Sequence, residues 1–296
     1  MTAGDAATAR GARSPIQAWD VFTNILTVVL AFMFGFPLFW AVSSALKLPI
    51  ELNVIPPLWF PPAPRWSNFL EVNEVLPFFR FMGNTAVITV ASTVGGVLTA
   101  SLVAYGFSHF RFRGRQAIFI LMLSTMMLPM EVTLIPTYLI FNELRMVDTF
   151  WPLFLPDWFG GGPFAIFLFR QFFLSIPRDL SDAAKIDGCH VMRFFRSILV
   201  PLSVPVMITL SILFFQGSWN ELMRPLIYLT SMTNYTVSVG LMFLRTQILA
   251  NVAQRGEPTE HLLMAGSVIS MMPSLILFFI LQRYFIRGVI MSGIKG

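Results

Sequence analysis

Long stretches without a charged residue set the strongest limit on how this chain folds. Residues 21–46 and 81–110 contain 26 and 30 uncharged residues, and a helix that crosses a bilayer needs about 20 apolar residues. Residues 197–220 and 262–282, with 24 and 21 residues, are also long enough. The chain is 56% hydrophobic and only 12% charged, a composition that excludes large soluble domains. We therefore predict an integral membrane protein.

Two further apolar stretches are interrupted by charges. Residues 116–141 contain Glu131, and residues 150–174 contain Asp157 and Arg170. Both stretches still have the length of a span. The sequence thus predicts an all-α integral membrane fold with six transmembrane helices, and we expect Asp157 and Arg170 to lie near the membrane interface.

The distribution of Lys and Arg sets the predicted orientation, because cytoplasmic loops are enriched in them. With six spans, the side that holds both termini collects 12 of these residues and the other side 6. Residues 225–244 are also uncharged, but a seventh span there would move the basic C-terminal tail outside and bury many hydroxyl and amide groups in hydrocarbon. We predict cytoplasmic tails at 1–20 and 287–296 around a transmembrane domain at 21–286. The apolar run after residue 20 is too long for the core of a cleaved signal peptide.

The loop at residues 175–201 combines two short helices with a glycine between them. Leu180, Ala183, Ala184 and Asp187 follow a helical spacing that places them on one small, mostly apolar face. Gly188 is a natural end for this helix. Small side chains allow another surface to approach closely, so this face suits contact with a partner.

The same loop contains a longer pattern: Asp182, Ala183 and Ala184, then three residues, Gly188, nine residues, Ile198 and finally Pro201. It resembles the EAA loop of the permease subunits of bacterial and archaeal ABC importers, which reads E-A-A, three residues, Gly, nine residues, I-x-L-P. Asp182 replaces the Glu of that pattern and Val200 replaces its Leu. The resemblance implies a cytoplasmic EAA-type coupling loop between helices 4 and 5, in the cell membrane of a prokaryote.

The resemblance also implies partners. They are a sister permease subunit, a cytoplasmic ATPase dimer and an extracytoplasmic solute-binding protein, with membrane lipid around the spans. ATP and Mg²⁺ would bind to the ATPase and no cofactor to this chain, whose sequence has no G-x-x-x-x-G-K-[ST] motif. The chain is therefore expected to be a non-catalytic subunit. The implied coupling residues are Asp182, Ala183, Ala184, Lys185, Ile186, Asp187, Gly188, Ile198 and Pro201, with Lys295 and Gly296 of the tail as further ATPase contacts.

A narrower resemblance to the sugar-importing, maltose-permease-like branch rests on several short motifs. They are Pro129 with residues 133–136 (TLIP), residues 219–221 (WNE) with Pro225, and the tail 288–296 (GVIMSGIKG). Together they favour a sugar or a polyol, glycerol phosphate types included, as the solute. An ABC importer of a non-sugar solute is the alternative within this class.

Polar residues in or near the spans are the candidates for the solute pathway, because charges at the bilayer centre are costly and face protein or water. They are Glu131, Trp219, Asn220, Glu221 and Arg224. Two structural interpretations stay open: Glu221 and Arg224 pair on one helix, and Trp219 packs between helices. Gly95 and Gly96 indicate close packing of their helix against a neighbour.

Other function classes fit less well. Ion-coupled secondary transporters often have ten or more spans with inverted repeats, whereas six spans and no repeat are visible here. A membrane enzyme would need a nucleophile with a base or a metal cluster, but one cysteine and three scattered histidines give no metal-ligand spacing. The net charge of +5 fits topology and anionic lipid, and no nucleic-acid motif accompanies it.

Overall fold

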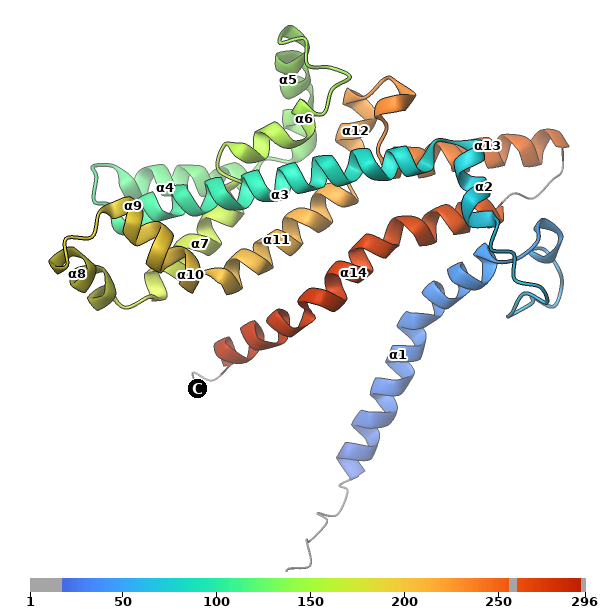
Figure 1. The fold of residues 1–296 in the computed structure, drawn as a ribbon, viewed down its shortest axis with the longest axis horizontal. Coiled ribbons are helices and arrows are strands. Elements are labelled where there is room, and N and C mark those ends of the chain that lie inside the picture. Colours follow the sequence, from blue (N-terminus) through green and yellow to red (C-terminus); the bar gives the residue numbers. More distant parts are fainter. Residues whose placement is uncertain (1–17, 256–259, 294–296) are drawn as a thin grey trace, which may run out of the picture.

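The computed structural model describes residues 18–255 and 260–293, which fold into helices joined by loops, with no strand in these ranges (Figure 1). The α-helices are α1 (Ala18–Ala45), α2 (Asn68–Val75), α3 (Phe78–His109), α4 (Arg115–Ser124), α5 (Met130–Glu143), α6 (Trp151–Phe154), α7 (Pro163–Ser175), α8 (Arg178–Ile186), α9 (Val191–Phe194), α10 (Val200–Leu202), α11 (Val204–Trp219), α12 (Met223–Tyr228), α13 (Val237–Arg255) and α14 (Glu260–Gly293). The predicted all-helical fold is confirmed for the described residues.

Three of the predicted spans are single helices long and apolar enough to cross a membrane. They are Trp19–Ala45, Phe78–His109 and Glu260–Gln282. Each coincides with a stretch in which the sequence has almost no charge, so length and hydropathy alone located them.

The other three candidate spans are bent pairs of helices. Arg115–Met127 and Met130–Glu143 meet at 101°, Trp151–Ser175 and Arg178–Ile186 at 74°, and Val191–Leu202 and Val204–Trp219 at 76°. If each pair counts as one span, the chain has up to six.

Residues 197–220 differ from the one unbroken stretch that the sequence indicated. The helix breaks at Ser203, between Pro201 and Pro205, two residues that cannot donate a backbone hydrogen bond. The Ser203 hydroxyl donates to the carbonyl of Leu199 at 2.6 Å. A charge-free stretch therefore gave the length of this region but not its bend.

Helix α3 is the centre of the packing and touches its neighbours through two glycines. A Cβ placed on Gly95 would lie 2.0 Å from Cδ1 of Trp158, and one on Gly96 would lie 2.7 Å from Cε1 of Phe214. The indole Nε1 of Trp158 also donates to the carbonyl of Ala91 at 2.9 Å. The predicted close packing at Gly95 and Gly96 is confirmed, and it brings the segment around Trp158 directly onto α3.

We expect Gly95→Ala to destabilise the chain by about 1–3 kcal/mol, because the Trp158 indole must leave its place. Gly106→Ala on the same helix is the matched control, since a Cβ there meets nothing within 4 Å. That control should be neutral or stabilising by up to about 1 kcal/mol. Thermal unfolding of the purified variants measures both. Equal midpoints for the two variants would contradict the packing described here.

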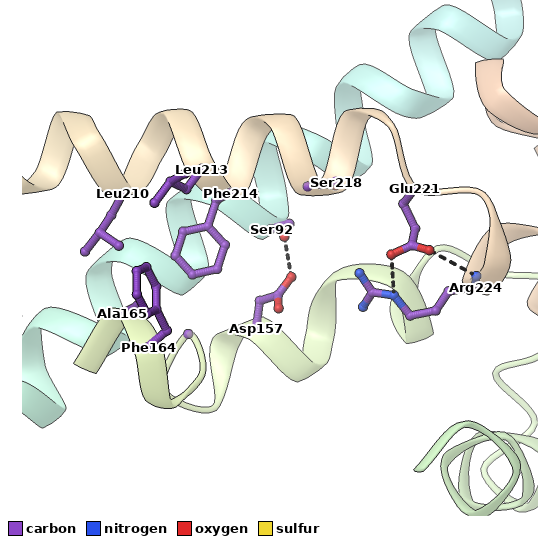
Figure 2. Close-up of a pocket in the computed structure, with 12 residues that line it drawn as sticks. Ser92, Asp157, Phe164, Ala165, Leu210, Leu213, Phe214, Ser218, Glu221 and Arg224 are labelled. Atoms are coloured by element: carbon purple, nitrogen blue, oxygen red, sulfur yellow. Dashed lines mark hydrogen bonds and ion pairs between the residues drawn. The ribbon is translucent and has the colours of Figure 1, made fainter. Parts of the chain in front are cut away.

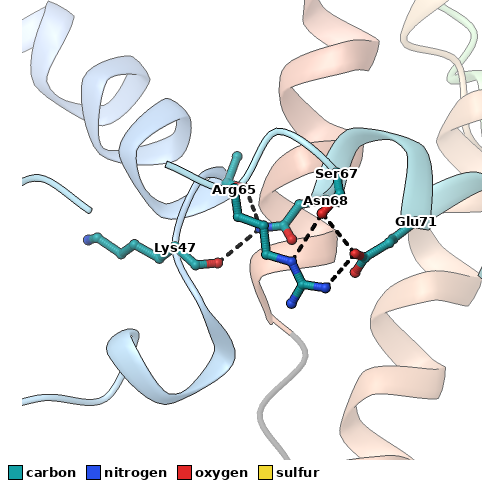
Figure 3. Close-up of polar contacts among 6 residues, drawn as sticks. Lys47, Arg65, Ser67, Asn68 and Glu71 are labelled. Carbon is teal, nitrogen blue, oxygen red and sulfur yellow. Dashed lines mark hydrogen bonds and ion pairs between the residues drawn. The ribbon is translucent and has the colours of Figure 1, made fainter. Parts of the chain in front are cut away.

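A cap of polar contacts joins the end of α1 to the start of α2 (Figure 3). The buried Asn68 donates through Nδ2 to the carbonyls of Ala45 and Lys47, both at 2.9 Å. Arg65 pairs with Glu71 at 2.7 Å across the same turn. These bonds satisfy carbonyls that the end of a helix leaves without partners. Figure 1 shows this cap and α8 at opposite ends of α3.

Asp148, in the loop after α5, holds the segment that follows α12. Its carboxylate accepts bonds from the backbone N–H groups of Thr230 and Ser231 at 3.0 and 2.9 Å, and from the Ser231 hydroxyl. Burial raises the pKa of Asp148, but these hydrogen bonds outweigh it and lower the pKa from 3.8 to about 2. Its backbone has a φ of +61°, a region that Asn and Asp tolerate better than other residues.

We expect Asp148→Ala to destabilise the protein by about 1 kcal/mol, a modest value because the site is partly exposed to solvent. A lowered pKa means that the carboxylate stabilises the fold fully above pH 3.8, and that this contribution disappears as the pH falls toward 2. Thermal unfolding at pH 7 and across that range measures it. Asp148→Asn keeps an acceptor and the backbone tolerance, so it should lose less. A larger loss for Asn than for Ala would contradict this role.

Candidate functional site

A cavity of about 240 Å³ lies between α3, the short 3-10 helix η3 (Leu155–Trp158), α7 and α11. Figure 2 shows that its walls are apolar at one end and polar at the other. The residues that line it are Ser92, Asp157, Gly161, Phe164, Ala165, Leu210, Leu213, Phe214, Gly217, Ser218, Glu221 and Arg224.

Three charged side chains form the polar end of the cavity. The Ser92 hydroxyl of α3 donates to the Asp157 carboxylate of η3. Arg224 donates through Nε to Glu221 at 3.2 Å, and both side chains are about one-fifth exposed, at 21% and 19%. The cavity therefore offers carboxylate acceptors and guanidinium donors next to phenyl rings (Figure 2).

Of the five predicted pathway residues, Glu221 and Arg224 line this cavity. Asn220 is exposed and donates to the Gln216 side chain at 3.0 Å. Glu131 is exposed in the first turn of α5 and is not part of the lining. The structure therefore brings only two of the five together at the cavity.

Trp219 lies in the packing between helices instead of the cavity lining. Its side chain is 4% exposed, its ring stacks on Phe215 at a centroid distance of 5.4 Å, and Nε1 donates to the carbonyl of Ser270 in α14 at 2.9 Å. These contacts fit the packing interpretation that the sequence left open.

Asp157 and Ser92 are cavity residues that the sequence reasoning did not select. The structure does not test whether Asp157 lies near the membrane interface, but it shows that η3 brings Asp157 onto α3, where it meets Ser92. The signal that pointed to it was the presence of a carboxylate inside an apolar stretch. Ser92 gave no such signal, because serine is common in transmembrane helices.

Helix α8 carries most of the predicted coupling residues, and it presents an apolar surface to solvent. Ile186 is 86% exposed and Leu180 43% exposed, and Ala183 between them is exposed as well. Ala184, in contrast, is 7% exposed and belongs to a core with Phe194 and Phe195. The two alanines, which the sequence placed on one face, therefore have different surroundings.

Two charged side chains of α8 contact each other. Lys185 pairs with Asp182 at 2.8 Å, one turn apart on the exposed surface. The hydrogen bond and the charge of Lys185 lower the pKa of Asp182. Asp187 follows the last residue of the helix, and Gly188 has a φ of +69°. This left-handed conformation favours glycine, and it lets Cys189 donate to the carbonyl of Ala184 at 2.8 Å.

The remaining predicted coupling residues lie after this turn or outside the residues that the structure describes. Ile198 lies in a π-helical turn, Phe195–Leu199, and Pro201 lies in α10. Lys295 and Gly296 fall outside the described residues. In the part of the chain that the structure describes, no group of three or more His, Cys, Asp or Glu side chains is arranged to hold a metal ion.

Two thirds of the chain match a known protein family. The family of the binding-protein-dependent transport system inner membrane component matches residues 92–291. The chain is a member of this family. The matched range includes the cavity and α8.

Relatives that match over most of their length are transport permeases as well. The chain is 33% identical to the arabinooligosaccharides transport system permease protein AraQ of Halalkalibacterium halodurans, over 96% of this chain and 98% of AraQ. It is 34% identical to the probable ABC transporter permease protein YurM of Bacillus subtilis, over 93% and 87%. It is 31% identical to the sn-glycerol-3-phosphate transport system permease protein UgpE of Yersinia enterocolitica, over 92% and 96%. The predicted identity as an ABC importer permease, a transport subunit of the membrane, is confirmed.

A solved structure shares the fold. The crystal structure of a bacterial ABC transporter involved in the import of the acidic polysaccharide alginate aligns with a TM-score of 0.78 and 21% identity, over 91% of this chain and 97% of that chain. At this identity the match describes the fold alone.

Proposed function

We propose that this permease forms half of the translocation pathway of an importer for a sugar or a related polyol, and that α8 couples it to a separate ATPase. The observation that carries the coupling role is the exposed apolar surface of α8, made by Leu180, Ala183 and Ile186. Several apolar side chains exposed together on a helix outside the proposed spans mark a surface that a partner covers.

The coupling proposal assigns a role to each part of the loop at 175–201. Ala183 lets the ATPase approach closely and Ile186 fills an apolar recess in it, whereas Asp182 and Asp187 anchor the helix by polar contacts. Gly188 supports the turn into α9. When two ATPase subunits close on ATP and Mg²⁺, α8 moves with them, and the spans reorient between inward-open and outward-open states.

In the proposed topology the fourth span is Trp151–Ser175 and the fifth includes Val204–Trp219, with α8 outside the membrane between them. This topology has six spans, with a domain at 21–286 and cytoplasmic tails at 1–20 and 287–296. Two observations support it. Helix α8 and the cap that joins α1 to α2 lie at opposite ends of α3 (Figure 1). With six spans, the side that holds both termini and the loop at 175–201 also collects 12 Lys and Arg residues against 6 on the other side, as expected for the cytoplasmic side. The C-terminal residues Lys295 and Gly296 are proposed to reach the ATPase pair.

The solute class follows from the chemistry of the cavity and from the relatives. Two carboxylates, a guanidinium and phenyl rings suit a molecule with many hydroxyls and apolar ring faces. Arg224 is already paired with Glu221, so the cavity favours an uncharged sugar over an anionic one. AraQ is named for arabinooligosaccharides and UgpE for sn-glycerol-3-phosphate, a sugar and a polyol phosphate, and only the first of these is uncharged.

The remaining partners complete this pathway. A cavity of about 240 Å³ is smaller than the 300–1,000 Å³ of typical ligand pockets, so a sister permease is proposed to supply the other wall. A structure related in fold contains a periplasmic protein bound to an alginate pentasaccharide, and we propose an extracytoplasmic solute-binding protein for this permease as well.

Co-purification tests the proposal. A tagged chain should retain an ATPase, a second permease and a binding protein, and the binding protein should release a sugar or polyol on denaturation. Uptake into proteoliposomes that contain this chain alone, driven by an ion gradient without ATP, would instead support an ion-coupled secondary transporter. A bound amino acid or inorganic ion would support an importer of a non-sugar solute.

A further inference from the structure

A second, larger cavity lies behind the coupling helix. It has a volume of about 620 Å³ and is enclosed by α8, the end of α3, the start of α4 and the end of α7. Four cationic side chains line it: Arg111, Arg115, Arg178 and Lys185. Asp182 is the one carboxylate in its lining, so the cavity carries a clear excess of positive charge.

Two of the four cations form no ion pair and no side-chain hydrogen bond in the described part of the chain. Lys185 pairs with Asp182 at 2.8 Å, and Arg115 donates to the carbonyl of Phe110 at 3.0 Å. The side chains of Arg111 and Arg178 form no ion pair or hydrogen bond within the described part of the chain, although the charge of Arg178 acts on the nearby Asp182. Two guanidinium groups from separate segments of the chain thus line one cavity, and guanidinium groups favour anions with several oxygens.

The apolar part of the lining determines which anion fits. Phe110 and Leu174 line the cavity and are 44% and 45% exposed, and Ile176 adjoins them. The cavity also lies where the transmembrane helix α3 ends, at His109. A cationic recess with an apolar edge at the end of a span suits a lipid, whose phosphate binds the cations while its chain covers the apolar edge. A free phosphate would use only the cations.

We propose that this cavity binds the phosphate headgroup of an anionic membrane lipid, held between Arg111 of the α3–α4 loop and Arg178 at the start of α8. The proposal rests on the cytoplasmic placement of α8 in the proposed function. The lipid links the coupling helix to the ends of α3 and α7 and adds a contact that the protein alone lacks. The movement of α8 then depends on anionic lipid in the inner leaflet.

Native mass spectrometry of the purified assembly tests this site. The probes are phosphatidylglycerol, phosphatidylcholine with the same acyl chains, and inorganic phosphate. The cavity variant is Arg111→Gln with Arg178→Gln. The matched control is Arg193→Gln with Arg196→Gln, which removes the same charge from exposed positions of the loop at 175–201 that lie outside the cavity.

Phosphatidylglycerol should bind the native assembly and the control with affinities within about twofold of each other. Its affinity for the cavity variant should fall by about tenfold or more, since each cation near a membrane surface contributes about a fivefold factor. The exposed single variant Arg178→Gln should lose about fivefold, and it gives a result even if the double variant misfolds. Equal binding of phosphatidylcholine, equal losses in the control, or inorganic phosphate binding as strongly as the lipid would each overturn the proposal.

Different experimental results would contradict the lipid site and the proposed function. An assembly that contains the ATPase but shows no preference for phosphatidylglycerol contradicts the lipid site alone. A chain that binds phosphatidylglycerol at this cavity but never retains an ATPase contradicts the coupling role alone.

Discussion

Ala183→Trp is expected to reduce solute uptake by more than about tenfold while the permease still folds and reaches the membrane. Ala183 is exposed on α8, so a larger side chain there meets no neighbour in this chain. A docked ATPase, however, would have to accommodate an indole in a closely packed contact, and overpacking costs about 1–3 kcal/mol or more. Uptake by cells at matched expression measures the effect, and ATP hydrolysis by the purified assembly shows whether it has become independent of transport.

Two control variants separate docking from folding. Ala184→Trp changes the neighbouring residue, which is 7% exposed in the protein's own core, so it should lower the thermal stability of the chain itself. Gln116→Trp places an indole at an exposed position of α4 near the same end of the molecule and should leave uptake nearly unchanged. Normal uptake by Ala183→Trp, at normal expression, would exclude α8 as the contact.

The second large effect is expected at the ion pair of the cavity. Replacing Glu221 and Arg224 together by methionine roughly keeps side-chain volume but removes the polar contacts that these two residues would make to the solute. Because a hydrogen bond to a charged group contributes about 1.5–3 kcal/mol, we expect the apparent KM for uptake to rise by about 10- to 100-fold. Uptake measured over a range of solute concentrations tests this.

The double variant also decides between the two interpretations of the pair. If Glu221 and Arg224 only stabilise each other, each single Met variant impairs the protein by leaving one charge unpaired, and the double variant recovers. If both contact the solute, the double variant is no better than either single one. Arg65→Met with Glu71→Met is the control, since it removes another ion pair, at 2.7 Å, that lies outside the cavity. Recovery of the Glu221/Arg224 double variant would remove both residues from the solute pathway.

Sequence reasoning located the features that depend on local composition. The charge-free stretches identified the three straight spans because a bilayer imposes a minimum length. The turn at Gly188 followed from the need for a left-handed residue at the end of α8. The packing role of Gly95 and Gly96 followed from their lack of a side chain.

Features that depend on how distant segments meet did not follow from the sequence. The contact of Asp157 with Ser92 joins residues 65 positions apart. Trp219 was a candidate for the solute pathway, but its contacts with Phe215 and Ser270 place it in the packing between helices. Ala183 and Ala184 are adjacent in the sequence, yet only the packing of Phe194 and Phe195 distinguishes the buried one. Helical periodicity alone does not give the rotation of α8 relative to the spans.

Site-specific cross-linking from α8 tests the central claim most directly. The sequence has a single cysteine, Cys189, so Ile186→Cys in a Cys189→Ser background carries one thiol, at a position that is 86% exposed. In inside-out membrane vesicles, a short thiol-directed photo-cross-linker on this residue should form a covalent product with the ATPase subunit. Modification of the same thiol by an impermeant reagent in intact cells, with no product containing the ATPase, would contradict the account.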